Sequence, residues 1–207
     1  MALANYADLQ ASVASWLNRT DLAAGIPDFI TLAESRINRD LRVRQMETVA
    51  LIPTVAGSRT VALPADFLEM RTLRLLTAPP RVLNHATLSA LGQAWGDQVG
   101  TPVDYAITGG DLVLGPAPGG VHTLEATHYQ RIPALSAGSP TNWLLTRNPD
   151  VYLYAALMEA APYLMDDQRL PVWGQLYDRA IGAVKMDDNG SRWNAATLFV
   201  RSDRIAP

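Results

Sequence analysis

Hydrophobic residues recur at helical spacing near both ends of this 207-residue chain. Residues 5–18 and a segment that begins at Pro27 each predict an amphipathic helix, and a third such pattern starts at Leu170. Proline favours a first helical turn, because its missing N–H would have no partner there. The third helix is expected to stop by the sequence DDNG, residues 187–190. The apolar positions of the three helices are Tyr6, Leu9, Val13, Trp16 and Leu17; Ile30, Ala33, Ile37 and Leu41; and Leu170, Trp173, Tyr177, Ile181 and Val184.

Between Met46 and Ile132 the pattern changes to short runs of β-forming residues, separated by turns that contain glycine and proline. The sequence AITGGDLVLG, residues 106–115, predicts a β-hairpin, because glycine supplies the positive φ that tight hairpin turns need. Residues 84–96 predict one short helix within this section. The predicted strands are the runs 48–53, 59–64, 68–76, 80–84, 103–108, 111–116 and 122–132.

The stretch TNWLLTRNPDVYLYAAL, residues 141–157, is the most strongly specified part of the chain. It is expected to pass from an aromatic loop into a helix, with Asn148 at the N-cap, Pro149 at the first helical position and Asp150 in the first turn. This helix has apolar side chains on nearly all sides, which predicts a place in the centre of a bundle. Pro162 should kink or end it, because proline lacks an N–H and crowds the preceding turn.

These patterns predict an α+β protein: a helical bundle formed by the N- and C-terminal helices, an inserted antiparallel β module, and an extended C-terminal tail. The helices at each end have one apolar face, and each end needs the other to cover it. The predicted domains are a discontinuous helical bundle of residues 1–45 and 141–188, a β-rich module of residues 46–140, and a tail of residues 189–207.

The C-terminal tail holds more apolar side chains than a free tail should carry. Burying each of them is worth roughly 1.5–3 kcal/mol, so they are expected to pack on their own domain or on another subunit. The run Thr197–Val200 also suits addition as a strand to the sheet edge of a neighbour. The predicted partner-contact residues are Trp193, Leu198, Phe199, Val200, Arg201, Arg204 and Ile205.

The polar face of the second helix carries Arg36, Asp40 and Arg44 at four-residue spacing. Opposite charges at this spacing stabilise a helix by about 0.2–0.5 kcal/mol per pair. The pattern predicts a solvated ladder of ion pairs or, alternatively, a contact site for an acidic partner.

The residue types that usually act in catalysis or bind metals form no recognisable pattern in this sequence. With no cysteine, disulfides, thiolate catalysis and cysteine-bound zinc are excluded. Among the histidines His85, His122 and His128, the last two lie about 20 Å apart along one predicted strand, too far to share a metal. The phosphate-binding loop, the dinucleotide-binding glycine pattern and the nucleophile elbow are absent. We therefore expect no metal, no cofactor and no catalytic residue.

Paired carboxylates are the remaining candidates for catalysis, because glycosidases need two at a defined separation. The candidate pairs are Asp66 with Glu69, Asp166 with Asp167, and Asp187 with Asp188. The last two pairs fit helix ends, where aspartate caps helices and forms turns, and Asp66 fits a turn in which it bonds nearby backbone. These simpler explanations favour a structural protein over a hydrolase.

The net charge of −3 argues against a dedicated nucleic-acid binder, and no large segment of the chain is basic. The N-terminus lacks a basic region followed by an apolar run, so no secretion signal is expected. The sequence contains no run of about 18 apolar residues, so no membrane span is expected. The expectation is a soluble protein that begins in a cytoplasm and has no membrane partner.

Three long segments carry a family resemblance, in order and at plausible spacing. They are YADLQASVASWLNRTDLAAGIPDFITLAESRINRDLRVRQMET at residues 6–48, VALPADFLEMRTLRL at 61–75, and YQRIPALSAGSPTNWLLTRNPDVYLYAALMEAAPYLMDDQRLPVWGQLYDRAI at 129–181. The patterns L-P-x-D-F-L-E and N-P-D-x-Y-L-Y-x-A-L are the most characteristic. Together they resemble the head-to-tail adaptor, or connector, proteins of tailed bacteriophages. The likeness is greatest to the adaptors of short-tailed phages, including their tail tubular protein A and tail accessory relatives.

The resemblance implies a non-enzymatic virion protein that forms a dodecameric ring beneath the portal protein at the unique vertex of the capsid. The helical domain would face neighbouring copies and the portal, and the β module would help to receive tail tube, nozzle or neck proteins. Genomic DNA would pass through the central hole without specific binding. The C-terminal tail would reach onto the portal or the next copy. Such a protein would be assembled in the cytoplasm of the bacterial host and reside in the virion neck.

Two alternative functions stay open at this point. One is a neck or tail-completion protein one layer further down, which would also form a ring but would bind tail proteins and not the portal. The other is a virion-associated peptidoglycan glycosidase, for which the carboxylate pairs are the only support.

Overall fold

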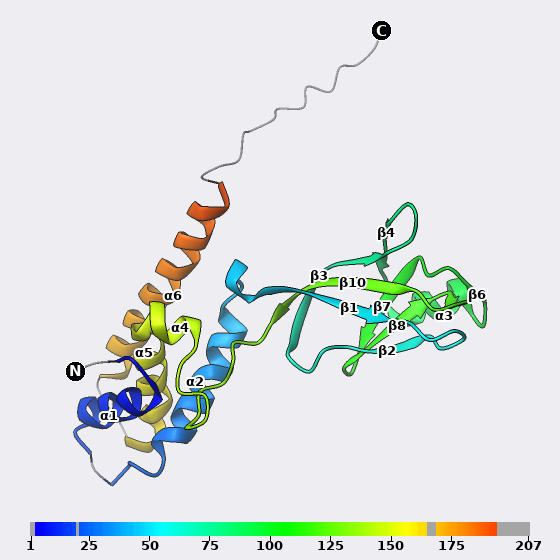
Figure 1. Cartoon of the computed structure of the whole chain (residues 1–207). Helices are drawn as coiled ribbons and strands as arrows, with labels where there is room; N and C mark the ends of the chain where they lie inside the picture. Colours follow the sequence, from blue (N-terminus) through cyan, green and yellow to red (C-terminus); the bar gives the residue numbers. More distant parts are fainter. Residues whose placement is uncertain (1–2, 20, 165–168, 194–207) are drawn as a thin grey trace. The chain divides into compact units, whose positions relative to one another are not determined.

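The computed structural model describes residues 3–19, 21–164 and 169–193. The fold is α+β, as the sequence pattern predicted, with helices near both ends of the chain and strands between them (Figure 1). Within the described ranges, no helix is long and apolar enough to cross a membrane.

The chain divides into two compact units. We call the first the helical unit, formed by Met1–Arg44 and Ile132–Pro207, and the second the β unit, formed by Gln45–Arg131. The short 3-10 helix η1 (Arg44–Met46) contains the division between them. The segment 132–140, which leads back from the last strand, therefore belongs to the helical unit.

The helical unit is arranged around one central helix, α5 (Figure 1). α5 contacts α1, α2, α4 and α6, and it buries residues on all sides. This confirms the position that its uniformly apolar surface predicted. The elements of the unit are α1 (Tyr6–Leu17), α2 (Ile26–Asp40), α4 (Trp143–Arg147), α5 (Pro149–Ala160), the 3-10 helix η2 (Ala161–Leu164) and α6 (Leu170–Trp193).

The first two helices turn most of their predicted apolar positions inward, although Tyr6 is only half-buried. All four predicted positions of α2 are buried, and so are Leu9, Val13 and Leu17 of α1. Trp16 is 43% exposed, although its spacing placed it on the buried face. The side chain of Asn5 accepts a hydrogen bond from the Asp8 N–H at 2.9 Å and so caps α1, which explains where this helix begins.

The aromatic segment before Asn148 is a helix and not the predicted loop. α4 begins after Asn142, whose side-chain oxygen accepts a hydrogen bond from the Leu145 N–H at 2.9 Å. It ends at Arg147 because the residue before a proline is driven out of the helical region, and Asn148 has φ −136° and ψ 65°. Asn148 does occupy the N-cap position of α5, but its side chain makes no capping hydrogen bond. The capping side chain is Asn142, at the start of α4.

The ends of α5 and α6 test two further predictions. α5 gives way to the 3-10 helix η2 at Ala161, so the effect expected of Pro162 is confirmed. α6 runs to Trp193, so the prediction that it stops at residues 187–190 is wrong: one glycine costs a helix about 1 kcal/mol, too little to end it. Leu170 is half-exposed, while the other predicted apolar positions of α6 are buried.

The β unit contains two four-stranded sheets with an apolar core between them. The strand orders are β1-β10-β3-β4 and β2-β8-β7-β5, and β6 pairs with β9 separately. The pairs are antiparallel except β5 with β7 and β6 with β9, which are short and parallel. The elements are β1 (Glu47–Pro53), β2 (Thr60–Ala62), β3 (Phe67–Leu75), β4 (Arg81–Val82), β5 (Asn84–His85), α3 (Leu88–Trp95), β6 (Val99–Gly100), β7 (Asp104–Thr108), β8 (Asp111–Gly115), β9 (Ala117–Pro118) and β10 (Thr123–Gln130).

The predicted hairpin is formed by β7 and β8, and the predicted short helix, α3, packs on it. Gly109 has φ 66° in the hairpin turn, a conformation that glycine adopts without strain. Gly115 at the end of β8 leaves room for Leu91 and Trp95 of α3, which a Cβ would displace. The Trp95 Nε1–H donates to Asp104 Oδ2 at 2.8 Å and ties the helix to β7.

Candidate interaction surfaces

The predicted partner-contact residues at the C-terminus lie outside the described part of the structure. Trp193 ends α6, but its side chain is not among those described. The others fall within residues 194–207; they are Leu198, Phe199, Val200, Arg201, Arg204 and Ile205. Their role therefore stays a prediction, as does any role for Asp166 and Asp167.

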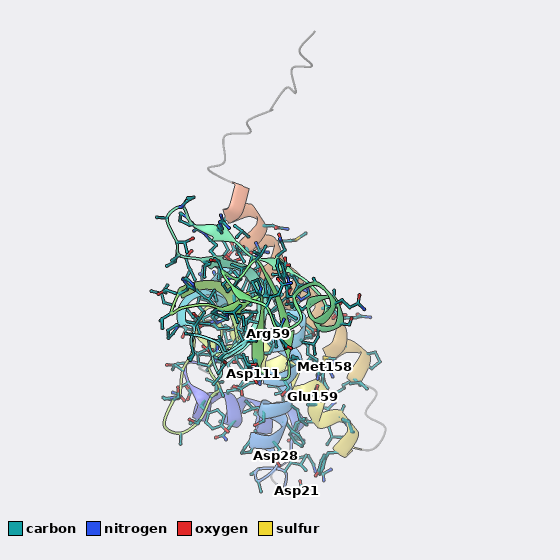
Figure 2. All side chains as sticks on the ribbon, turned by 90° about the vertical axis from the view of Figure 1, so that its right-hand side faces the viewer. Asp21, Asp28, Arg59, Asp111, Met158 and Glu159 are labelled. Atoms are coloured by element: carbon teal, nitrogen blue, oxygen red, sulfur yellow. The ribbon has the colours of Figure 1, made fainter. Side chains whose placement is uncertain are left out.

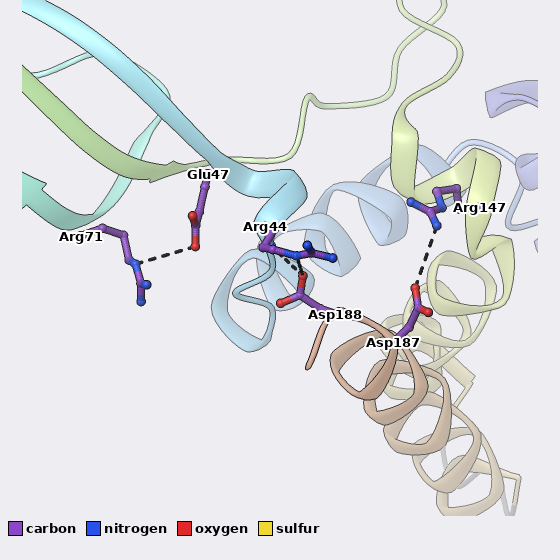
Figure 3. A network of polar contacts seen from close by, with 6 residues as sticks. All are labelled: Arg44, Glu47, Arg71, Arg147, Asp187 and Asp188. Carbon is purple, nitrogen blue, oxygen red and sulfur yellow. Dashed lines mark hydrogen bonds and ion pairs between the residues drawn. The ribbon is translucent and has the colours of Figure 1, made fainter. Parts of the chain in front are cut away.

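The last turns of α6 are tied to the helical unit by Asp188. Its carboxylate accepts hydrogen bonds from the Arg44 backbone N–H at 3.1 Å and from the Arg44 Nε at 2.9 Å (Figure 3). The Asp188 side chain is only 6% exposed. Because Arg44 begins η1, the carboxylate also satisfies a backbone donor at the start of that short helix.

The neighbouring Asp187 makes a different contact. It is 71% exposed and lies 3.9 Å from the guanidinium of Arg147 in α4 (Figure 3). The two aspartates therefore point from α6 toward two different partners. They lie inside the helix and not at its end, so their interpretation as capping or turn residues is wrong.

The predicted ion-pair ladder along α2 does not form, because its members reach other helices. Arg36 Nε lies 2.6 Å from the carboxylate of Glu159 in α5. Figure 2 labels Glu159 and its neighbour Met158. Asp40 accepts a hydrogen bond from the Tyr177 hydroxyl of α6 at 2.8 Å. Arg44, the third member, pairs with Asp188 of α6. One face of α2 thus supplies side chains that bind α5 and α6, and the acidic groups it contacts belong to its own unit.

Tyr177 shows how strongly this face is enclosed. Burial of its ring raises the pKa of the Tyr177 hydroxyl well above its usual range, and the hydrogen bond to Asp40 raises it further. The hydroxyl therefore stays protonated and acts only as a donor to Asp40. This bond fixes α6 against the C-terminal half of α2.

The return segment 132–140 is held on α2 by two side chains. The Glu34 carboxylate accepts a hydrogen bond from the Leu135 N–H at 2.7 Å, and the Asn38 side-chain oxygen accepts one from the Ile132 N–H at 2.9 Å. Glu34 is buried, and burial raises the pKa of its carboxyl, although the bond from Leu135 opposes the rise. These bonds pair backbone donors that an irregular segment would otherwise leave unsatisfied.

Asn142 joins this segment to α4 and α5. Its side-chain amide donates to the Pro133 carbonyl at 2.8 Å and to the Tyr152 hydroxyl at 2.7 Å. Tyr152 is 1% exposed, and burial raises the pKa of its hydroxyl well above the usual range. Tyr152 is therefore a core residue. Tyr154 is half-buried, with its ring edge-on to Trp16 at a centroid distance of 6.1 Å.

In the β unit, one sheet presents an apolar row on its outer face, at edge strand β1. We call Val49, Leu51 and Pro53 the outer row; Val49 and Leu51 are 58% and 63% exposed. They alternate with the more buried Ala50 and Ile52. The sequence predicted this strand but not its exposed row, because nearly every position of the run is apolar and hides the alternation.

Beside the outer row, the same sheet carries pairs of opposite charge. Arg74 of β3 lies 2.9 Å from Glu125 of β10. Arg71 lies 3.7 Å from Glu47 (Figure 3). Its guanidinium also covers the ring of Tyr129, 5.5 Å from the ring centroid. These partly exposed pairs give the outer face a mixed character: it is polar on β10, β3 and the first residue of β1, Glu47, and apolar along the rest of β1.

The L-P-x-D-F-L-E stretch joins β2 to β3 beside the hairpin turn. The Leu63 N–H donates to the Gly110 carbonyl at 3.0 Å, and the Arg131 N–H donates to the Asp66 carbonyl at 2.8 Å. An open cavity of about 340 Å³ lies here, lined by Leu63, Pro64, Ala65, Phe67, Ile107, Gly109, Gly110 and Arg131. Asp66 thus takes part in backbone bonding at a turn, as expected, but through its own carbonyl.

His85 and His128 lie in different surroundings and do not form a common site. His128 is buried with its Nδ1 3.3 Å from the Ala126 carbonyl, and its ring lies 5.4 Å from that of Phe67. His85 is exposed, with its ring edge-on to Tyr105. Among the described residues, no group of three or more histidine, aspartate or glutamate side chains could hold a metal ion.

Comparison with known proteins identifies the family. Residues 4–201 match the SU10 adaptor protein family, a span that includes elements of both units. No curated protein matches the chain. Because the match covers nearly the whole chain, this protein belongs to the SU10 adaptor protein family and is a phage head-to-tail adaptor.

Proposed function

We propose that this adaptor forms a dodecameric ring beneath the portal protein at one vertex of the phage capsid. There it joins the capsid to the tail and continues the channel through which the DNA leaves. It acts as a structural protein and not as an enzyme. The ring assembles in the cytoplasm of the bacterial host and resides in the neck of the virion.

Family membership is the observation that carries this proposal. The match runs over residues 4–201, so the helical unit and the β unit both belong to the adaptor architecture. A protein that joins two assemblies needs more than one contact surface, and two compact units can supply them. We assign the helical unit to neighbouring copies and the portal, and the β unit to tail tube, nozzle or neck proteins.

Exposed apolar side chains on the helical unit support contacts between copies. In a closed ring each subunit has two neighbours, and the same heterologous contact repeats around the axis. Large apolar residues at least half exposed in the described part of this unit are Leu32, Tyr163, Val172 and Met186. Burial in such contacts would remove them from water and stabilise the ring.

We also assign the C-terminal residues to partner contacts. Trp193, Leu198, Phe199, Val200 and Ile205 would each gain roughly 1.5–3 kcal/mol on burial. Arg201 and Arg204 lie among them and suit interfaces, because guanidinium groups bind carboxylates through two hydrogen bonds.

The charge of the chain is compatible with DNA that slides past without being held. Each phosphate that a protein neutralises adds affinity and releases a counterion, so a channel wall should not be strongly basic. This chain has a net charge of −3. We therefore propose transient passage of DNA without specific binding.

Sedimentation velocity of the protein mixed with the portal protein of the same phage tests the proposal. We expect a complex that is larger than the portal ring alone and contains several adaptor copies per portal ring. Two control samples, the protein alone and the protein with isolated neck or tail proteins, identify the layer to which it binds.

Two results would overturn the proposal. A folded monomer that never sediments with the portal would exclude an adaptor ring at that position. Binding to neck or tail proteins but not to the portal would place the protein one layer further down.

A further inference from the structure

The two main sheets of the β unit end in four edge strands of unequal length. β4 and β5 have two residues each and β2 has three, whereas β1 has seven. β1 pairs only with β10, so the backbone groups on its other side have no strand partner in the described structure. Short edge strands are one way in which proteins prevent unwanted strand pairing, and β1 is the long exception.

β1 also lacks the other features that protect an edge. Its register with β10 is continuous over all seven residues, so no bulge twists it away. It contains no lysine, its only charge is Glu47 at the first position, and its proline is confined to the last, Pro53. The outer row adds exposed apolar side chains to the open backbone. A strand with these properties can pair along its free edge with a strand from another chain.

The chain itself contains a segment suited to this edge. Residues 194–207 follow α6, and Thr197–Val200 is a run of β-forming residues within them. In an extended segment Leu198 and Val200 share one face, on which they can continue the outer row.

We infer that the C-terminal segment of one copy adds as a strand to β1 of the next copy in the ring. The inference rests on the proposed ring, because a repeated heterologous contact provides one segment and one edge at every interface. The three residues between Trp193 and Thr197 span roughly 10–14 Å when extended. β1 of the receiving copy must therefore lie close to the end of α6 of the donor.

Cysteine cross-linking tests this contact, because the natural chain has no cysteine. One full-length sample carries Leu51→Cys and a second, with a different affinity tag, carries a cysteine in place of Leu198, Phe199 or Val200. The two samples are mixed with a cysteine-free portal, oxidised and separated without reductant. The matched control is Val121→Cys, which places a thiol at another exposed position of the β unit.

We expect disulfide-linked pairs of differently tagged chains for Leu51→Cys with positions 198 and 200, and at least tenfold less with position 199. This alternation is the mark of a paired strand, because neighbouring side chains point to opposite faces. Val121→Cys should form no such pairs.

Several results would overturn the inference while the proposed ring stands. Rings that form on the portal without these cross-links would exclude the contact, and so would equal cross-linking at all three positions. Linkage of position 198 to a portal engineered with surface cysteines, and not to β1, would assign the segment to the portal. If no ring or portal complex forms even with the wild-type chain, the proposed function itself fails.

Discussion

The two units use polar side chains in opposite ways. In the helical unit, buried or half-buried polar groups join segments more than a hundred residues apart, as in the Arg44–Asp188 and Arg36–Glu159 pairs. In the β unit, the ion pair Arg74–Glu125 lies on the outer face of a sheet whose opposite face forms an apolar core. Hydrophobic burial forms the core of both units, but in the helical unit polar contacts also join distant segments of the chain.

The difference follows from how each unit is made. The helical unit is assembled from two pieces of chain that the β unit separates, and helices do not share backbone hydrogen bonds with one another. Specific side-chain bonds such as those of Glu34, Asn38 and Asn142 therefore hold the returning segment in place. Sheets are already joined by backbone ladders, so their surface ion pairs add little.

The largest effect is expected from Tyr152→Asp, in the core of the helical unit. The change removes a buried aromatic ring and introduces an unpaired charge, which together should cost at least about 3–5 kcal/mol. Far-UV circular dichroism during urea titration should show early loss of helical signal. Tyr154→Asp, at a half-buried position, is the matched control and should cost less. Equal midpoints for wild type and Tyr152→Asp would contradict the assignment of Tyr152 to the core.

Leu112→Ala should have the second largest effect and should act on the β unit. Leu112 is fully buried between the sheets, so its truncation should cost about 2–5 kcal/mol. Hydrogen exchange followed by mass spectrometry should show faster exchange in β7, β8 and β10, with α5 unchanged. Val121→Ala, at an exposed position, serves as the control. Equal loss of protection in α5 would show that the two units unfold as one.

A third prediction compares two adjacent aspartates. Asp188→Ala removes a buried carboxylate that accepts from both the Arg44 N–H and the Arg44 guanidinium, and it should lower the free energy of unfolding by about 1–3 kcal/mol. Asp187→Ala and Glu125→Ala remove exposed or partly exposed ion pairs and should cost only about 0–1 kcal/mol. Thermal and chemical unfolding of the three variants measures these values. The comparison between the units is wrong if Glu125→Ala costs as much as Asp188→Ala.

The smallest effect concerns the pH dependence set by Glu34. Burial raises the pKa of Glu34, so the folded protein holds this proton more tightly than the unfolded chain does. Its contribution to stability is complete below the ordinary value of 4.5 and is lost as the pH rises through the folded pKa.

Glu34→Gln keeps an acceptor for the Leu135 N–H and removes the titration. The variant should therefore gain stability relative to wild type as the pH rises from about 4 to about 7. Urea titrations across this range measure the difference. A stability difference between variant and wild type that does not change with pH would refute the role assigned to Glu34.

Much of the fold could be predicted because its causes are local. The periodic faces of α1 and α2, the glycine turn at Gly109 and the proline at position 149 each depend on neighbouring residues in the sequence. α4 was missed because its cap, Asn142, lies in a stretch whose tryptophan and leucines are equally consistent with a loop. The sequence DDNG suggested an end to α6, but Asp188 instead pairs with Arg44, a contact that no local pattern reveals.

The candidate interaction surfaces could be predicted only in part. The apolar C-terminal residues were visible in the sequence, because they follow the glycine at position 190 and are more apolar than a free tail should be. The outer row of β1 was not visible in the sequence, because Val49 and Leu51 have the character of core residues. Only the strand order places them on an outer face. The ladder of Arg36, Asp40 and Arg44 was misassigned because spacing along one helix cannot reveal partners on other helices.

Cryo-electron microscopy of the adaptor bound to its portal tests the central claim most directly. The account predicts a closed ring of adaptor copies on the portal axis, with a central hole wide enough for duplex DNA. An adaptor that binds as an isolated subunit, or a preparation in which the portal carries no adaptor density while the protein stays folded in solution, would contradict it.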